Sequence, residues 1–135
     1  MIDDIIEYIE SKITTLNTNN DSNLNKNVKS VYGKNVDDLI MDTPTTNTIT
    51  ISYVGSEYQM IYENAGLDEL RHTFIICVGS NKAFDITKEL IGLLNNPFEI
   101  NDNNYKPYVV PKFAPLPSND NNKLVLFFEV SFGQI

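Results

Sequence analysis

The sequence predicts an α+β fold in which two helices pack on one mixed, mostly antiparallel sheet, and a β-hairpin projects from that sheet. Two segments carry apolar residues at helical spacing, whereas the segments between and after them carry alternating β-branched and aromatic residues. The 135 residues contain no internal repeat and no linker-like stretch. This length is typical of one domain, so residues 1–135 are expected to form a single domain around one core.

The first predicted helix covers residues 2–16. Its apolar residues recur every three or four positions, and Asp3 and Asp4 lie in the first turn, where negative charge interacts favourably with the helix dipole. The stripe consists of Ile2, Ile5, Ile6, Ile9, Ile13 and Leu16. The Asn-rich tract at residues 17–27 is expected to end this helix and to form a solvated loop. The second predicted helix covers residues 83–95 and stops before Pro97.

A β-hairpin is predicted between the two helices. Residues 46–55 alternate in polarity and are rich in β-branched side chains, which indicates a half-buried strand. Two further apolar segments, 58–62 and 71–78, flank the turn sequence Asn64-Ala65-Gly66. We therefore expect an extended hairpin over residues 57–71.

The remaining strand predictions differ in the strength of their patterns. Residues 124–132 are almost entirely apolar or β-branched, which predicts a central strand buried on both faces at its start. Weaker strand candidates are residues 28–32, 98–100 and 108–110, and residues 36–41 are too irregular to assign. The Asn-rich residues 101–104 predict a loop, and Pro111, Pro115 and Pro117 predict a bend.

The chemistry-bearing residues predict neither a metal site, nor a cofactor site, nor an enzyme. His72 and Cys77, the single histidine and the single cysteine, lie five positions apart on a predicted strand and would point to opposite faces. No nucleophile or orienting group for His72 is identifiable. The adjacent acids Asp3-Asp4 and Asp37-Asp38 would not face each other, and the six glycines form no phosphate-binding motif.

The charge pattern argues against nucleic acid as a direct partner. Eighteen acidic and ten basic side chains give a net charge of -8, and no basic stripe is present that could neutralise phosphates. The N-terminus lacks the positive and apolar regions of a signal peptide, and the apolar runs are far shorter than the roughly 20 residues that span a bilayer. We therefore expect no specific nucleic-acid binding, no membrane insertion, and a location inside the cell.

The order of these elements resembles a known family. An N-terminal helix is followed by the strand Ile49-Thr50-Ile51-Ser52-Tyr53-Val54-Gly55, the return segment from Arg71 to Val78, the helix at 83–94 and the closing strand at 125–132. This arrangement, over nearly the whole chain, is similar to the tail-terminator proteins of long-tailed phages. It resembles in particular the Mu-like branch, found in contractile tails and phage-tail-like bacteriocins.

The resemblance implies a structural protein of a phage tail or tail-like particle. Family members form a ring, commonly a hexamer, that caps the tail tube, stops its polymerisation and meets the end of the sheath in contractile systems. The implied partners are other copies of the chain, the tail tube protein and the sheath protein. The implied location is the bacterial cytoplasm during assembly and the particle afterwards.

The candidate subunit-contact residues lie on the predicted hairpin. Apolar and aromatic side chains close to turn signals, together with the only arginine, make up this set: Tyr58, Met60, Tyr62, Leu67, Leu70 and Arg71. Two other function classes stay open. One is a phage neck or baseplate adaptor without terminator activity, and the other is an enzyme that would need a deep pocket containing His72 and an acid.

Overall fold

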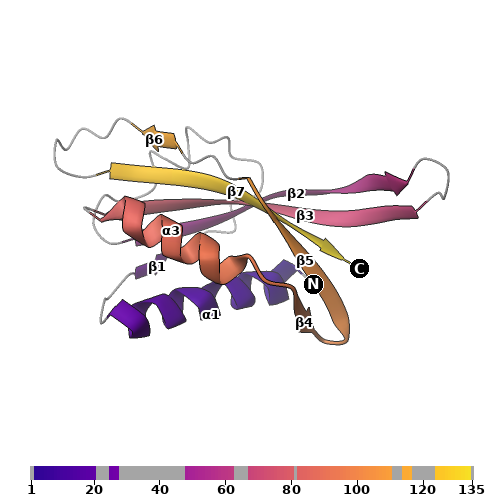
Figure 1. Ribbon diagram of the computed structural model, residues 1–135, viewed down its shortest axis with the longest axis horizontal. Helices are drawn as coiled ribbons and strands as arrows, with labels where there is room; N and C mark the ends of the chain where they lie inside the picture. Colours follow the sequence, from indigo (N-terminus) through magenta and orange to yellow (C-terminus); the bar gives the residue numbers. More distant parts are fainter. Residues whose placement is uncertain are drawn as a thin grey trace.

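The computed structural model describes residues 2–20, 25–27, 48–62, 67–80, 82–110, 114–116 and 124–134. In these ranges two helices, α1 (Ile2–Asn20) and α3 (Ala83–Leu94), lie on one face of a sheet (Figure 1). The strands are β1 (Asn25–Asn27), β2 (Thr48–Tyr62), β3 (Leu67–Ser80), β4 (Phe98–Ile100), β5 (Asn103–Val109), β6 (Ala114–Leu116) and β7 (Leu124–Gln134). The predicted α+β fold, with two helices packed on one sheet, is confirmed.

The sheet is mixed and mostly antiparallel. Its strand order is β1-β2-β3-β7-β5-β4, and β6 also pairs with β7. Only β1 runs parallel to its neighbour β2; the other pairs of the described sheet are antiparallel. β7 is hydrogen-bonded to β3 on one side and to β5 and β6 on the other. The prediction that the last apolar run forms a central strand is therefore confirmed, and the strand continues two residues beyond the expected end.

The core lies between the sheet and the two helices. The isoleucine stripe of α1 is buried there together with alternate residues of β2, β3 and β7, which include Ile51, Phe74 and Phe132. Each fully buried side chain of this size contributes about 1.5–3 kcal/mol of transfer free energy. Tyr8 of α1 stacks on Phe98 of β4, with ring centroids 3.6 Å apart, and this contact joins the helix to the far edge of the sheet.

The helix α1 is longer than the predicted 2–16, because polar side chains continue it through Asn20. Thr14, Thr15 and Thr18 each donate a hydrogen bond to a backbone carbonyl four residues earlier. The Asn20 amide donates to the Leu16 carbonyl at 2.9 Å and to Glu89 of α3 at 2.7 Å. The tract that predicts a helix stop therefore caps the last turn and ties it to α3.

The two Asn-rich tracts are not the plain loops that the sequence predicts. Asn25–Asn27 forms the short strand β1, and β5 begins already at Asn103. The turn before β5 is tight, since Asn101 and Asp102 adopt positive φ angles of 52° and 65°. Asn and Asp tolerate this left-handed region better than other residues that carry a side chain, which explains their use in a two-residue hairpin turn.

The strand predicted at 46–55 is present as part of β2, but it is not half-buried at its start, because residues 48–52 are buried on both faces.

Other predicted segments have mixed outcomes. The helix predicted at 83–95 is confirmed as α3, and the strand at 98–100 as β4. Within the predicted proline bend, Ala114–Leu116 forms β6 on the edge of β7. Leu126, near the start of β7, is buried and Phe127 is half-buried, so burial on both faces is only partial in the described part. The candidates at 28–32 and 36–41 and the turn at 64–66 lie outside the described residues.

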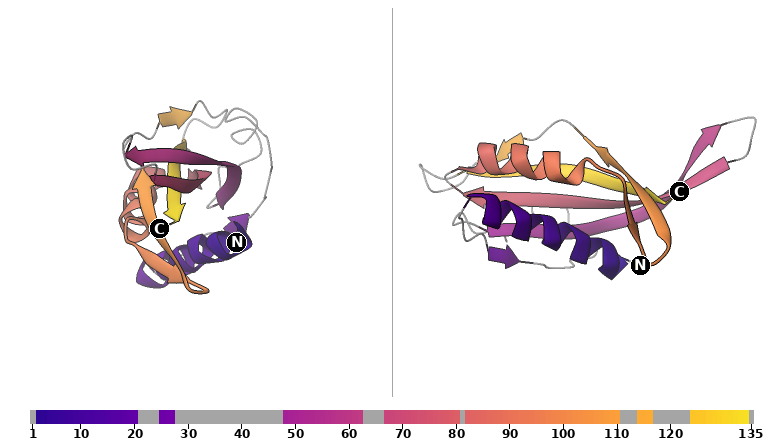
Figure 2. Two further views of the ribbon diagram at one scale, coloured as in Figure 1. Left: turned by 90° about the vertical axis from the view of Figure 1, so that its right-hand side faces the viewer. Right: turned by 60° about the horizontal axis from the view of Figure 1, so that its bottom comes forward.

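The predicted hairpin projects from the sheet. β3 pairs with β7 only from Leu70 onward, opposite Gln134, so that its first three residues pair with β2 alone. Figure 2 shows the paired ends of β2 and β3 extending beyond the body of the molecule. The hairpin leaves the sheet next to a β-bulge between Tyr53 and Gly55, where Gly55 has a φ angle of 156°. A bulge bends and twists its strand, which gives the hairpin its direction.

Candidate functional site

The predicted contact residues lie together on the hairpin. In the strand register Tyr58 is opposite Leu70 and Tyr62 is opposite Leu67, while Met60 is opposite Asp68. Tyr58 is 69% exposed, the most exposed large apolar residue among those described. Leu70 is half-buried. For Met60, Tyr62 and Leu67 the structure describes the backbone register and not the side chains.

Arg71 does not extend freely into solvent, because it is part of a compact cluster with Glu69 and Tyr108. Arg71 Nε donates to Glu69 Oε2 at 2.9 Å, and the guanidinium carbon lies 3.8 Å from the centroid of the Tyr108 ring. Tyr108 Oη donates to the same carboxylate, 2.9 and 3.0 Å from its two oxygens. The cluster joins β3 to β5 across β7 at the base of the hairpin.

Burial and charge set the protonation of this cluster. Desolvation acts against the charged form of Arg71, but its hydrogen bond to Glu69 and the negative charge nearby prevail and raise the pKa of the guanidinium. Desolvation and the hydrogen bond to Glu69 raise the pKa of Tyr108. Arg71 therefore stays charged and Tyr108 stays protonated, which lets both donate to Glu69, whose side chain is buried.

The backbone also makes room for the cluster. The Cα of Gly133 on β7 lies against the Glu69 carboxylate, and a Cβ at this position would overlap Oε1 and the carboxyl carbon. A glycine is required here by close approach rather than by its φ angle. Glu69, Arg71, Tyr108 and Gly133 thus form one packed unit on the sheet face that points away from the helices.

A second polar chain lies at the bulge. Tyr53 and Ser56 share a short hydroxyl hydrogen bond, and Ser56 Oγ lies 2.6 Å from His72 Nδ1. His72 is only 3% exposed, and its Nε2 has no hydrogen-bond partner in the described structure. Burial lowers the pKa of His72, so the imidazole is neutral near pH 7. This chain connects β2 on both sides of the bulge to β3.

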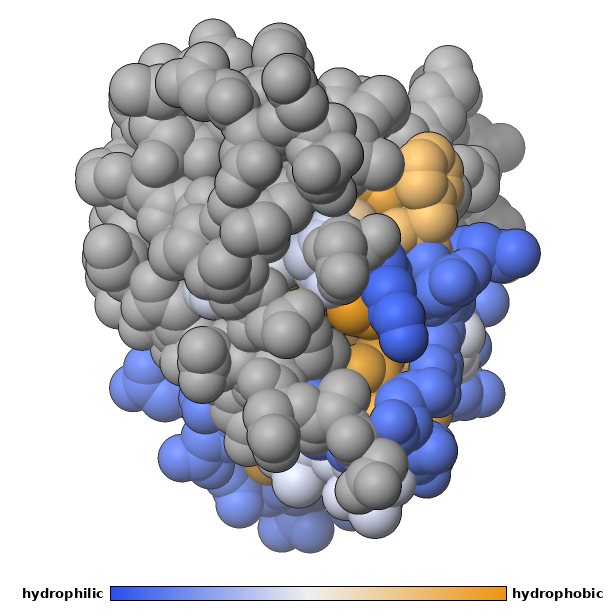
Figure 3. All heavy atoms as spheres, turned by 90° about the vertical axis from the view of Figure 1, so that its left-hand side faces the viewer, coloured by the Kyte–Doolittle hydropathy of each residue, from blue (hydrophilic) through white to orange (hydrophobic). Residues whose placement is uncertain are grey.

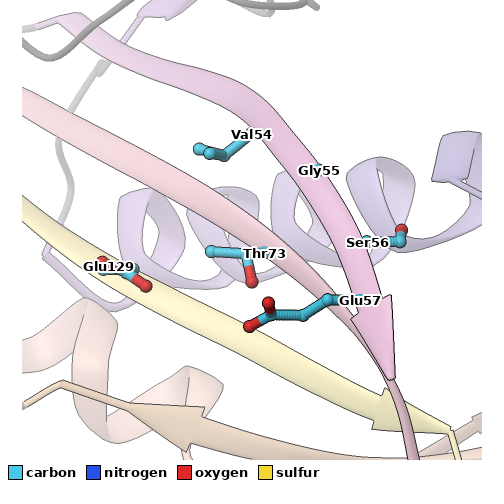
Figure 4. A pocket seen from close by; sticks show the side chains of 6 residues that line it. All are labelled: Val54, Gly55, Ser56, Glu57, Thr73 and Glu129. Carbon is cyan, nitrogen blue, oxygen red and sulfur yellow. The ribbon is translucent and has the colours of Figure 1, made fainter. Parts of the chain in front are cut away.

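An open groove of about 260 Å³ lies at the bulge, on the outer face of the sheet. It is lined by Val54, Gly55, Ser56, Glu57, Thr73 and Glu129. Figure 4 shows Glu57 reaching across β3 towards Thr73, while Ser56 points away. Thr73 in turn hydrogen-bonds Ser131 of β7 at 2.8 Å. With two carboxylates in its lining, the groove favours positively charged groups.

The opposite end of the molecule has a different surface. Figure 3 views that end, where the described surface is mostly hydrophilic and hydrophobic residues occupy a narrower area.

Few large apolar residues are exposed in the described ranges: besides Tyr58, they are Val54, Phe84 and Val110. Val54 lies in β2 at the bulge, so both exposed apolar residues of β2 belong to the hairpin or its base.

The residues considered for catalysis and metal binding are separated by the sheet. His72 lies on the same face of β3 as the core residue Phe74, whereas Cys77 is on the opposite face and fully buried. Among the described residues, no three side chains of His, Cys, Asp or Glu come together as a potential metal site. His72 lines neither the groove at the bulge nor the larger concavity of about 420 Å³ beside Tyr105.

No pattern in the sequence singles out Glu69, Tyr108 and Gly133 as one cluster. Tyr108 and Glu69 are 39 positions apart and come from different segments, so no local spacing predicts their contact. The two-residue spacing of Glu69 and Arg71 is a weak signal, because it places both side chains on one face of a strand.

In the described residues no helix is both long and apolar enough to cross a membrane. Neither a protein-family model nor a curated protein matches this chain.

Proposed function

We propose that this protein is a structural assembly protein that forms a ring on the end of a phage tail tube or a tail-like tube. In this role the ring, commonly of six copies, stops polymerisation of the tube protein and contacts the end of the sheath. It assembles in the bacterial cytoplasm and remains part of the particle. The proposal rests on the resemblance in the order of elements described above.

The single observation that carries the proposal is the projecting hairpin. Strands β2 and β3 continue past the end of β7 and pair only with each other, and Tyr58 is largely exposed on this extension. A two-stranded extension contributes little to the core of its own subunit. A ring of identical subunits needs two different, complementary patches on each copy, and a hairpin that reaches beyond the body supplies one of them.

The burial of His72 argues against catalysis by this residue as the main function. A general base must come within hydrogen-bonding reach of its substrate, and His72 is buried under the hairpin base and bound to Ser56. The exposed surface of the hairpin is a better candidate for what the chain does, which is to bind another protein surface.

The experiment removes the hairpin tip in the bacterial strain that makes the particle. Residues 63–66 are replaced by a two-residue turn, or Met60 and Tyr62 are changed to Glu, and tails are measured by electron microscopy. We expect tubes of uncontrolled length while the other structural proteins are made normally. Replacement of Lys12→Gln on α1, far from the hairpin, is the matched control and should leave tail length unchanged.

The outcomes separate the hypotheses. Normal tails from a folded hairpin variant would reject the role of the hairpin, and normal tails after removal of the whole gene would reject terminator activity. Particles that lack a joined head or baseplate, but have tubes of normal length, would instead favour a neck or baseplate adaptor.

A further inference from the structure

Arg71 is held by Glu69 and Tyr108 and is still partly exposed. Its Nε is bound to Glu69, and its plane is held over the Tyr108 ring. The guanidinium also interacts with the Tyr108 side chain through its ring and through a side-chain hydrogen bond. The side chain is 28% exposed. The guanidinium is therefore held by residues of its own subunit while part of the Arg71 side chain reaches solvent.

A guanidinium held in this way is prepared to bind a carboxylate. Its Nη hydrogens lie in one plane and match the two oxygens of a carboxylate, which makes bidentate hydrogen bonds possible. The usual entropy cost of ordering a long side chain is already met within the subunit, because Glu69 and Tyr108 hold it. Binding here would therefore be stronger than at an ordinary surface arginine.

The charges around Arg71 favour one side of approach. Lys106 Nζ lies 5.5 Å from the centroid of the same Tyr108 ring, so a second positive charge lies beside Tyr108. Glu69 compensates one positive charge, and Glu57 is opposite Arg71 on β2. An incoming carboxylate is therefore favoured from the Lys106 side of Tyr108, away from Glu57.

We propose that Arg71 binds a carboxylate of a second copy of this chain. The inference rests on the proposed function for the existence of a contact between copies, and it names the group that makes the contact. Arg71 is the only arginine, and each copy carries 18 acidic against 10 basic side chains, so a neighbouring copy presents mainly carboxylates. Arg71 lies at the base of the hairpin, next to Leu70 opposite the exposed Tyr58.

The first test measures self-association of the full chain by sedimentation velocity from micromolar to millimolar concentration. Three variants are compared with the wild type: Arg71→Gln, Arg71→Lys and the control Lys12→Gln, which removes a cation that lies over the Tyr8 ring instead. We expect Arg71→Gln and Arg71→Lys each to weaken association at least about tenfold, since Gln carries no positive charge and Lys has no planar fork of N–H donors. Lys12→Gln should associate like the wild type. Circular dichroism verifies that each variant is folded.

The second test identifies the partner carboxylate. A carbodiimide joins an amine to a carboxylate only when they touch, so Arg71→Lys provides a zero-length probe at this position. The variant is cross-linked as a mixture of unlabelled and nitrogen-15-labelled chains, and the joined peptides are identified by mass spectrometry. We expect a mixed-label product that links position 71 to an acidic residue of the other chain.

Three results would overturn the inference. These are a wild type that stays monomeric at millimolar concentration, an Arg71→Gln variant that associates normally, or cross-links from position 71 to Glu69 of the same chain alone at a concentration where sedimentation shows the Arg71→Lys variant to be associated. Its failure is distinguishable from failure of the proposed function. Removal of the gene tests tail termination without reference to Arg71, whereas the association assay tests Arg71 without reference to tails.

Discussion

The carboxylate of Glu69 on β3 lies directly against the Cα of Gly133 on β7, on the outer face of the sheet. The same carboxylate accepts hydrogen bonds from Tyr108 and Arg71, so three elements of the sheet converge on one buried acid. This arrangement leaves no space for a side chain at position 133.

Gly133→Ala should destabilise the protein. The added methyl group would displace the Glu69 carboxylate, and overpacking of this kind costs about 1–3 kcal/mol. Urea denaturation followed by circular dichroism gives the free energy of unfolding. Gly92→Ala is the control, since a Cβ there meets nothing within 4 Å and an exposed helical Gly→Ala change should stabilise by about 0.5–1 kcal/mol. The Gly133→Ala effect should shrink in a Glu69→Ala background, and an unchanged effect would contradict the contact.

Tyr108→Phe should isolate the hydroxyl of the cluster. The ring that supports Arg71 remains, but the buried Glu69 loses a donor, which costs about 1–3 kcal/mol. The free energy of unfolding is again the measured quantity. Tyr58→Phe is a matched control, because the Tyr58 side chain is largely exposed and should tolerate the change with little effect. Equal effects of the two substitutions would show that the Tyr108 hydroxyl has no structural role.

Gly55→Ala should weaken the base of the hairpin. A φ angle of 156° is rarely adopted by residues with a side chain, and holding one there costs about 1–3 kcal/mol. Since a Cβ at Gly55 meets no atom within 4 Å, the cost comes from the backbone and not from a clash. Hydrogen exchange should show faster exchange of β2 amides near the bulge. Protection equal to that of the wild type would argue against strain at this position.

His72 should make stability depend on pH. Its pKa in the folded protein is lowered by burial, whereas in the unfolded chain it is about 6.5. The unfolded state therefore binds more protons below that pH, so the contribution of neutral His72 is present above about pH 6.5 and is lost as the pH falls towards the folded pKa.

The experiment compares the wild type with His72→Asn between pH 5 and 8. Asn can still bond Ser56 but does not titrate, so the variant should lack part of the decline in the free energy of unfolding. The difference in slope cannot exceed about 1.4 kcal/mol per pH unit for one proton. Parallel pH profiles would mean that His72 does not titrate differently in the two states.

The sequence alone determined the helices, the strand types and the projecting hairpin. The isoleucine stripe of α1 depends on local periodicity and indicates the buried face of the helix. The alternation around Ile49 and Ile51 indicates a strand but not its burial, because Thr50 on the other face of β2 is buried as well. The opposite placement of His72 and Cys77 also follows from strand geometry alone. Boundaries were less predictable where polar residues bond to the backbone, as at the end of α1, or form strands beside a neighbour, as at Asn25–Asn27.

Only the tertiary structure decided which polar side chains meet. The order in which β3, β7 and β5 lie side by side places Tyr108 and Gly133 against Glu69, and no pattern in the chain specifies that order. The orientation of the Arg71 guanidinium therefore depends on the tertiary structure, because Tyr108, over which it lies, comes from a distant segment. Pairing across a sheet depends on long-range packing, whereas the face that a residue occupies depends on its immediate neighbours in sequence.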